Sequence, residues 1–436
     1  MAYLPFILVN GVLFVRPAEI VPALIGLPIY NALMILCLGM SLFPMLKHLS
    51  GRKLAEQPVT ACVVLLLASV VLSHAVNLHF GDASEKGIDF GKTVLYYLLL
   101  ITIINTSGRL QSFLTWIVAF TAILTVVALL QYHEYIDLPA LEMAERYEED
   151  EEGELIPVYQ LYSTGIFNDP NDLSMILVIG MIISLYRVAD RHAGLFRVFW
   201  VLPVVLFTYA ILMTRSRGGF LALLASLMTL FVTRFGWRRS IPLILIALSA
   251  MLVLSGGRQA KISTGEETAQ ERMKLWSEGL SMMKQSPRWA LTGIGAGQYA
   301  EELPQVAHNS FVHAFVELGF LGGALFLGAF YVAARSLHQL GARSGEALDP
   351  ALRGMRPFLM AIVIGYSMGM ISLSRCYVVP TYVVLGLVSA YFQVAVCAPT
   401  DAIPRMDGRL VRRFAIIGVG FLIFIQLFIR ANVHYN

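Results

Sequence analysis

The chain has 436 residues, of which 57% are hydrophobic and only 14% are charged, whereas about 25% of residues are charged in an ordinary soluble domain. Its net charge is +3 and its mean hydropathy is +0.69. A soluble protein of this size cannot bury so much apolar surface and keep a wettable exterior. The composition therefore excludes a soluble globular enzyme, a disordered chain and a disulfide-rich secreted scaffold, and it indicates a polytopic membrane protein.

The cysteines stand apart from one another and form no CxxC pair or metal-like spacing. We therefore expect neither a disulfide framework nor a zinc site. The apolar segment 3–15 has no basic stretch before it and is followed by Pro17. We interpret it as a retained segment, either a further span or a re-entrant piece, rather than a cleaved signal peptide.

A helix needs about 20 largely apolar residues to cross the hydrocarbon core of a membrane. Runs of this kind follow one another along the whole chain. We predict one all-α transmembrane domain over residues 1–436 with about 12 membrane helices, or 11–13 when the segment 3–15 and boundary errors are included. The predicted spans are 28–46, 59–76, 90–105, 112–130, 171–186, 198–213, 217–233, 241–255, 309–333, 357–373, 378–396 and 414–430.

Lys and Arg residues are concentrated in every second loop between the predicted spans. By the positive-inside rule these loops are cytoplasmic, and the alternate loops lie on the outer face. Two outer loops are long, residues 131–169 and residues 256–306, and long loops usually carry function or are disordered. The acidic run from Glu148 to Glu152 is either a solvated stretch or a guide for an acceptor or partner.

Two arginines, Arg215 and Arg217, lie in the outer-face turn TRSRGGF between two predicted spans. A turn this short does not need charge, so two guanidinium groups at the hydrocarbon boundary indicate an anionic partner in the headgroup region. Anchoring to lipid headgroups by snorkelling side chains is the alternative. The small residues Ser216, Gly218 and Gly219 let another backbone or a ligand approach closely.

The segment EETAQERMKLWSEGLSMMKQSP in the long loop 256–306 predicts an amphipathic helix that ends before Pro287. Its apolar stripe suits a helix lying in the plane of the membrane interface. Arg272 is four residues before Trp276, at the edge of this stripe, from where it reaches a lipid phosphate or acts as an ordinary interfacial arginine. The stripe consists of Met273, Trp276, Leu280 and Met283.

The glycine-rich stretch from Gly293 to Gly297 does not follow a strand, so we interpret it as a turn and not as a nucleotide-binding loop. His308 and Asn309 stand at the mouth of the next span. Because an imidazole has an unperturbed pKa of about 6.5, His308 is a candidate for proton transfer or a structural histidine. Glu317, inside that span, is either part of a site or a structural partner of His313 four residues earlier.

Further polar residues begin or flank spans on the outer face. The cluster NDPND, Asn168 to Asp172, opens a span, and its Asp and Pro suit the start of a helix. Asn171 in this cluster, Arg288 after the amphipathic helix and Arg375 in SRCY complete the candidate residues.

Together these motifs resemble the O-antigen ligase and polymerase superfamily. In that family a His is followed by Asn, Ser or Gln, then nine residues, then Gly-x-x-Gly, and here His308, Asn309, Gly319 and Gly322 fit this pattern without a gap. The TRSRGGF turn, Arg272 before Trp276 and the NDPND cluster resemble other elements of the family. The resemblance covers about residues 160–330 in detail and the rest by topology.

The resemblance implies a GT-C-type glycosyltransferase of the bacterial inner membrane. Such enzymes transfer a glycan from undecaprenyl diphosphate to an acceptor hydroxyl on the periplasmic face; the acceptor is lipid A-core, a protein or another glycan. The family's diphosphate-binding arginines correspond to Arg217 and Arg272, and its essential histidine corresponds to His308. The residues that are candidates on our own reasoning alone are Arg215, Arg288, Arg375 and Glu317, whereas Asn309 and Asn171 are further candidates that lie within the motifs of the resemblance.

These residue types suit that chemistry. Arg binds phosphate oxygens bidentately and stays protonated, and a neutral His accepts the proton of an acceptor hydroxyl. No carboxylate pair argues for a covalent intermediate, so we expect direct, inverting transfer that needs no metal or cofactor, in contact with membrane lipids and without nucleic acid. A polymerase of lipid-linked repeats and a lipid-linked glycan transporter are the alternatives; a transporter predicts inverted repeats and broken helices.

Overall fold

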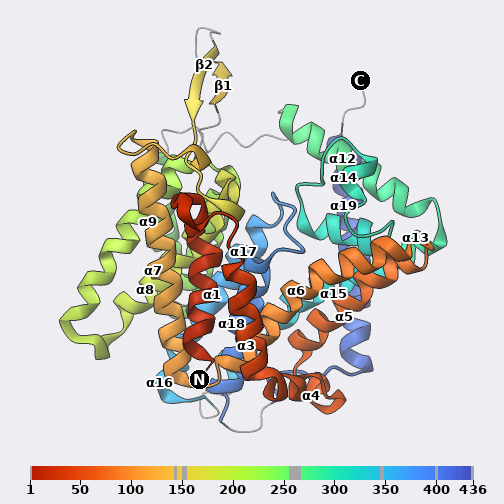
Figure 1. The fold of residues 1–436 in the computed structure, drawn as a ribbon, viewed down its shortest axis with the longest axis horizontal. Helices are drawn as coiled ribbons and strands as arrows, with labels where there is room; N and C mark the ends of the chain where they lie inside the picture. The colour runs from red at the N-terminus through yellow and green to blue at the C-terminus, as the bar shows by residue number, and fades with distance from the viewer. Residues whose placement is uncertain are drawn as a thin grey trace. The chain divides into compact units, whose positions relative to one another are not determined.

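The computed structural model describes residues 2–141, 145–149, 155–254, 267–343, 348–397 and 401–433. The chain divides into two compact units, each assembled from three separate stretches of sequence (Figure 1). Unit 1 comprises Met1–Met40, Thr106–Lys261 and Gly354–Gly369. Unit 2 comprises Ser41–Asn105, Ile262–Arg353 and Met370–Asn436.

Unit 1 contains long apolar helices and short connecting turns. Its α-helices are α1 (Tyr3–Val15), α2 (Pro17–Ile20), α7 (Ser107–Tyr132), α8 (Pro170–Ala189), α9 (Val201–Thr214), α10 (Arg217–Phe235), α11 (Trp237–Leu254) and α17 (Arg356–Gly369), together with most of α3 (Ile29–Leu46). Its 3-10 turns are η1 (Pro22–Leu24), η3 (Pro139–Leu141), η4 (Gly165–Phe167) and η5 (Arg191–Trp200).

Unit 2 combines long helices with several short ones. Its α-helices are α4 (Gly51–Glu56), α5 (Pro58–Ala75), α6 (Phe80–Ile103), α12 (Glu267–Lys284), α13 (Pro287–Thr292), α14 (Tyr299–Glu302), α15 (Ser310–Arg343), α16 (Pro350–Arg353), α18 (Val379–Ala395) and α19 (Gly408–Asn432), with one 3-10 turn, η2 (Lys47–Leu49). Figure 1 shows α12, α13 and α14 near one another, beside α19.

Every predicted span contains a helix at its place in the chain, so a membrane protein with several crossings is confirmed. The count of 12 is not confirmed, because eight helices of the described ranges are long and apolar enough to cross a membrane. The other helices fall short for visible reasons: α6 begins with charged turns, and α17 has only 14 residues. The eight are Ile29–Leu49, Pro58–Ala75, Ser107–Tyr132, Pro170–Ala189, Gly194–Thr214, Arg217–Phe235, Ser310–Gly341 and Gly408–Asn432.

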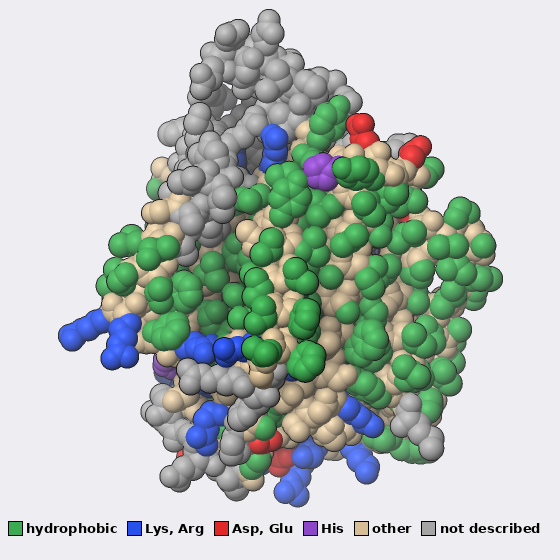
Figure 2. Space-filling model, turned by 90° about the vertical axis from the view of Figure 1, so that its left-hand side faces the viewer, with side chains coloured by type: hydrophobic (Ala, Val, Ile, Leu, Met, Phe, Trp, Pro, Cys, Tyr) green, Lys and Arg blue, Asp and Glu red, His purple; other side chains and the backbone are tan. Residues whose placement is uncertain are grey.

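Large hydrophobic side chains are exposed along these helices. Phe43 of α3 is 79% exposed and Phe424 of α19 is 62% exposed. Figure 2 shows one face of the molecule on which hydrophobic side chains predominate. Water does not tolerate contiguous apolar surface on this scale, so these side chains face lipid.

A two-stranded hairpin departs from the all-α prediction. Strands β1 (Glu145–Glu149) and β2 (Leu155–Tyr159) pair antiparallel, with Tyr147 opposite Pro157. Acidic residues disfavour strands, so the sequence of β1 does not predict a strand, whereas the β-branched residues of β2 suit one. The acidic run predicted to end at Glu152 lies in β1 as far as Glu149, and residues 150–154 are outside the described part of the chain.

Helix α15 consists of two helical pieces joined at Gly319, whose φ of 63° and ψ of −166° are not helical. The break removes the usual partners of the carbonyl groups at the end of the first piece. The N–H of Ile294 donates to the carbonyl of Val316 at 3.1 Å, and the N–H of Gly295 donates to that of Glu317 at 3.1 Å. The glycine-rich stretch is therefore a turn, as the sequence indicated, and this turn caps a broken helix, which the sequence did not indicate.

The two backbones meet too closely for side chains at the point of contact. A Cβ at position 293 would lie 2.0 Å from the carbonyl oxygen of Glu317, and a Cβ at position 319 would lie 2.4 Å from the backbone nitrogen of Gly293. Gly293 also has a φ of +86°. Both positions therefore require glycine, for space and for backbone conformation.

We expect Gly293→Ala to destabilise the protein by about 2 kcal/mol or more, because the added methyl group meets backbone atoms and the residue keeps a left-handed conformation. Thermal unfolding of the purified protein in detergent measures this loss. Gly420→Ala in α19 is the matched control, since a Cβ there meets nothing within 4 Å. Equal melting temperatures for the native protein and Gly293→Ala would contradict the role of this contact.

Candidate functional site

The turn that carries Arg215 and Arg217 is built from two helix ends in unit 1. Helix α9 ends at Thr214, and Arg215 has a left-handed φ of 50°, which reverses the chain. Ser216 then caps α10, because its Oγ accepts a hydrogen bond from the N–H of Gly219 at 2.9 Å. Arg217 is the first residue of α10 and is exposed, whereas Arg215 is half-buried.

Asn171 holds this turn against the start of α8. Its Oδ1 accepts a hydrogen bond from Ser216 Oγ at 2.6 Å. Gly219 allows the close approach, since a Cβ there would lie 2.2 Å from Ser174 Oγ. The predicted site residue Asn171 is thus a positioning residue for the turn of Arg215 and Arg217.

The N-terminal ends of α8 and α10 therefore lie together, and they differ in charge. Asp169 already occupies the end of α8, where its Oδ1 accepts from the N–H of Asn171 at 2.8 Å. The end of α10 carries Arg217 instead. A helix N-terminus bears a partial positive charge, and an adjacent guanidinium adds to it. The start of α10 is thus suited to an anionic ligand.

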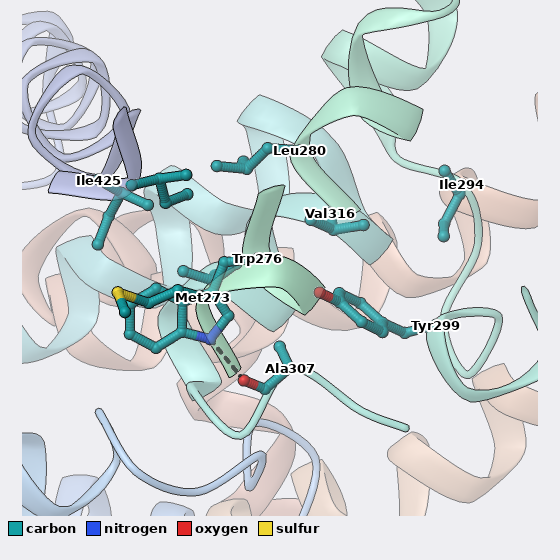
Figure 3. Packing of buried hydrophobic residues seen from close by; sticks show 10 residues of the cluster. Met273, Trp276, Leu280, Ile294, Tyr299, Ala307, Val316 and Ile425 are labelled. Carbon is teal, nitrogen blue, oxygen red and sulfur yellow. Dashed lines mark hydrogen bonds between the residues drawn. The ribbon is translucent and has the colours of Figure 1, made fainter. Parts of the chain in front are cut away.

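In unit 2 the predicted amphipathic helix forms as α12, and it ends at Lys284 before Pro287. We expected the apolar stripe of this helix to face lipid, but the stripe is buried in protein. Trp276 is 8% exposed, and the other stripe residues are more deeply buried. Figure 3 shows residues of this cluster around Trp276: Met273, Leu280, Ile294, Tyr299, Ala307, Val316 and Ile425. The prediction of a membrane-facing stripe was wrong because spacing identifies an apolar face but not what covers it.

Trp276 connects α12 to the residue before His308. Its Nε1 donates a hydrogen bond to the carbonyl of Ala307 at 2.6 Å, drawn as a dashed line in Figure 3. Arg272, which is half-buried, lies one helical turn before Trp276 on the same helix. Unit 2 therefore brings the helix of Arg272 to the backbone beside His308.

His308 has an unusual backbone at the start of α15. It is half-buried and has a positive φ of 46°, a conformation that costs energy in residues other than glycine. Asn309, only 1% exposed, caps α15. Its Oδ1 accepts from the N–H groups of Phe311 at 3.1 Å and Val312 at 3.2 Å. Asn309 thus fixes the start of α15. His308 comes directly before this cap, with its backbone in the left-handed conformation.

Arg375 comes to the same end of α15. The N–H of Ser310 donates to the carbonyl of Met370 at 2.8 Å, and Ser310 Oγ donates to the carbonyl of Leu373. The N–H of Arg375 donates to Ser310 Oγ at 2.8 Å. Ser310, which sequence reasoning missed, therefore ties the loop of Arg375 to the residue two positions after His308.

Glu317 is fully buried, and Tyr299, Tyr377 and His313 of unit 2 contact its carboxylate. Its Oε1 accepts from the N–H of Tyr299 at 3.0 Å, and its Oε2 accepts from the hydroxyl of Tyr377 at 2.8 Å. His313 Nε2 lies 2.9 Å from Oε1, although no ring nitrogen of His313 completes a hydrogen bond with the described residues. The sequence pointed to His313 alone, because Tyr299 and Tyr377 are distant along the chain.

The phenol groups around Glu317 remain hydrogen-bond donors. Burial, and then the carboxylate of Glu317, raise the pKa of Tyr377 well above its ordinary value. Burial raises the pKa of Tyr299 in the same way, and its hydroxyl donates to the carbonyl of Leu275 at 2.7 Å. Glu317 therefore joins α14, α15 and the loop of Tyr377, which supports a structural role for this carboxylate.

The candidate residues divide between the two units. Asn171, Arg215 and Arg217 are in unit 1, and the others are in unit 2. Arg288 is exposed on the short helix α13. The predicted joint action of Arg217 and His308 remains a prediction.

Residues 202–327 match the family described as O-antigen ligase. This match confirms the resemblance to the O-antigen ligase and polymerase superfamily. It supports a glycan-transferring function of the ligase or polymerase kind, with lipid-linked glycan and acceptor substrates. A comparison with curated proteins found no match. The matched segment contains Arg215, Arg217, Arg272, Arg288, His308, Asn309 and Glu317 but not Asn171 or Arg375.

We expect Glu317→Leu to lower stability by roughly 2–4 kcal/mol, since it leaves a buried N–H and a buried hydroxyl without an acceptor. Glu317→Gln retains one side-chain oxygen as an acceptor, so we expect it to lower stability less than Glu317→Leu. Thermal unfolding in detergent measures both losses. Glu302→Gln, at an exposed position of α14, is the control and leaves the melting temperature unchanged. A Glu317→Leu protein as stable as the native one would remove the structural role.

Proposed function

We propose that the protein transfers a glycan from undecaprenyl diphosphate to an acceptor hydroxyl on the periplasmic face of the bacterial inner membrane. One observation carries this proposal: a single family match, over residues 202–327, contains Arg217, Arg272 and His308. The transfer is direct, inverts the configuration at C1 of the sugar and uses no metal ion.

The arginines act on the donor. As the bond between C1 and the diphosphate oxygen breaks, its electron pair moves to the diphosphate, and negative charge grows there. Guanidinium groups of Arg217 and Arg272 bind the phosphate oxygens and stabilise this charge more in the transition state than in the ground state. The position of Arg217 favours the binding of phosphate, because Arg217 is the first residue of α10 and the N-terminus of this helix adds partial positive charge.

His308 acts on the acceptor. The acceptor oxygen forms the new bond to C1, and its proton moves to a ring nitrogen of the neutral imidazole. General-base catalysis of this kind contributes typically about 10²–10⁴-fold to a rate. The cap formed by Asn309 and the hydrogen bond from Trp276 to Ala307 hold the backbone on both sides of His308, so its position is preorganised.

The remaining candidates have supporting roles in this proposal. Arg215 adds positive charge beside Arg217, and Asn171 positions their turn through Ser216. Arg375 and Arg288 are further cations of unit 2 for the donor or the acceptor. Glu317 maintains the fold beneath the first turns of α15.

A lipid-linked glycan carrier is the second candidate, and one observation favours it. Helix α15 is broken at Gly319, close to the buried Glu317, as carriers with discontinuous helices require. The freed carbonyl groups of Val316 and Glu317, however, are occupied by Ile294 and Gly295 and are not left for an ion. Turnover of a lipid-linked glycan by the pure protein separates an enzyme from a carrier.

The acceptor separates a ligase from a polymerase. Purified protein is supplied with a lipid-diphosphate glycan and either lipid A-core or a second lipid-linked repeat. We propose ligase activity as the first candidate and therefore expect transfer of the glycan to lipid A-core. Growth of the lipid-linked glycan in place of transfer to the core would assign a polymerase.

We expect Arg217→Ala to reduce kcat/KM for the donor by roughly 10²-fold, because one preorganised donor of hydrogen bonds to the diphosphate is lost. Arg217→Lys is also impaired, since an ammonium group does not reproduce the bidentate fork. Assays of the purified variants in the presence of EDTA measure both effects. The matched control is Arg239→Ala, an exposed arginine of α11, which keeps native activity. Native donor kinetics in Arg217→Ala would refute the role of this residue.

His308→Ala should lower kcat by roughly 10²–10⁴-fold while donor binding is retained. The native activity should fall at acid pH, where the imidazole is protonated and no longer accepts a proton, and this dependence should vanish in the variant. His338→Ala, which removes an exposed histidine at the far end of α15, serves as the control. An unchanged pH profile in His308→Ala would exclude the general-base role.

A further inference from the structure

Three residues at the junction of α5 and α6 in unit 2 form a group of metal-ligand type. One ligand atom from each of His74, His79 and Asp82 lies within 4.8 Å of those of the other two. The turn between the helices creates this arrangement, since the N–H of His79 donates to the carbonyl of His74 at 3.1 Å. His79 is the N-cap of α6, and Asp82 lies three residues later in the first turn of that helix.

His74 supplies an independent observation. It is fully buried, and its Nε2 lies 2.9 Å from the carbonyl oxygen of Ala296. A carbonyl oxygen only accepts hydrogen bonds, so Nε2 carries the proton and Nδ1 of the neutral ring carries a lone pair. Nδ1 has no hydrogen-bond partner among the residues that the structure describes. A buried acceptor left unpaired is unfavourable, and a cation would satisfy it.

The backbone of Gly295 lies close to this lone pair. A Cβ at position 295 would lie 3.0 Å from His74 Nδ1 and 2.9 Å from its Cε1. The residue also has a φ of +124°, which side chains rarely adopt. Glycine at position 295 therefore lets this backbone approach the ring edge that carries the unpartnered nitrogen of His74.

We propose that His74, His79 and Asp82 bind a divalent transition-metal ion, with zinc as the preferred ion and Nδ1 as the ligand atom of His74. Two imidazoles and one carboxylate are ligands that zinc accepts, and a metal-bound histidine usually donates its other N–H to a carbonyl, as His74 does to Ala296. The side chains of His79 and Asp82 are 58% and 49% exposed, so the remaining coordination position is open to water.

The metal has a structural role, apart from the transfer chemistry. Ligands of tetrahedral zinc lie about 3.4 Å from one another, so the exposed side chains of His79 and Asp82 move inward while the buried His74 stays in place. Through the bond from His74 to Ala296, the ion ties α5 and α6 to the glycine-rich turn that caps the break at Gly319. The three ligands stand close together in the sequence, but their tie to Ala296 and Gly295 could not be predicted from it, because those two residues contribute backbone only.

Zinc binding is measured on the full-length protein, purified in detergent without an oligohistidine tag, stripped with EDTA and exchanged into metal-free buffer. We expect about one zinc ion per chain in a competition titration with a chromogenic chelator, together with a higher melting temperature. Magnesium should give neither effect, since it prefers oxygen ligands. His79→Ala and Asp82→Asn should each weaken zinc binding by roughly ten-fold or more and remove the thermal shift.

His79 is exposed and Asp82 is half-buried with its side chain 49% exposed, so we expect both variants to keep the fold, which their metal-free melting temperatures check. His338→Ala, which removes an exposed histidine elsewhere, retains zinc binding and the thermal shift. Absence of a zinc-dependent shift in the native protein would overturn the proposal, as would native zinc affinity in the double variant of His79 and Asp82. The experiment uses no glycan substrate, so its outcome is independent of the proposed transferase activity.

Discussion

The contact between the backbones at Gly293 and Gly319 determines how unit 2 is built. The break in α15 leaves carbonyl groups without helical partners, and only a chain that approaches within hydrogen-bond distance can satisfy them. The glycine-rich turn does this because it has no side chains at the contact. The same turn leads into α14, whose Tyr299 N–H binds the carboxylate of Glu317. A motif that looks like a ligand loop in sequence is thus the internal support of a helix.

Two charge arrangements with different physics follow from the fold. In unit 1, Arg217 stands at a helix N-terminus, where the backbone adds to its positive charge, so an anion is favoured there. In unit 2, the carboxylate of Glu317 is surrounded by hydrogen-bond donors and is buried. In the first arrangement side chain and backbone both contribute positive charge at a helix end, whereas in the second a buried negative charge is surrounded by hydrogen-bond donors of the protein. This difference is why we assign substrate binding to Arg217 and a structural role to Glu317.

Local sequence patterns predicted what depends on neighbouring residues. The apolar runs placed a helix at each span, the spacing of Met273 and Trp276 predicted α12, and Asp169 with Pro170 predicted the start of α8. Such patterns could not predict contacts between residues that are distant in the sequence. Tyr377 lies 60 residues from Glu317, and the cover over the stripe of α12 comes from α15 and α19. Periodicity defines a face, but only the folded chain decides whether protein or lipid covers it.

At His308 the residue that would suit the left-handed backbone best differs from the residue that the proposed chemistry requires. Glycine at this position would relieve the torsional cost, and asparagine would reduce it, yet either exchange would remove the imidazole that we propose as the general base. Variants selected only for heat resistance are therefore expected to replace His308 with another residue. A library screened for melting temperature alone would enrich inactive proteins.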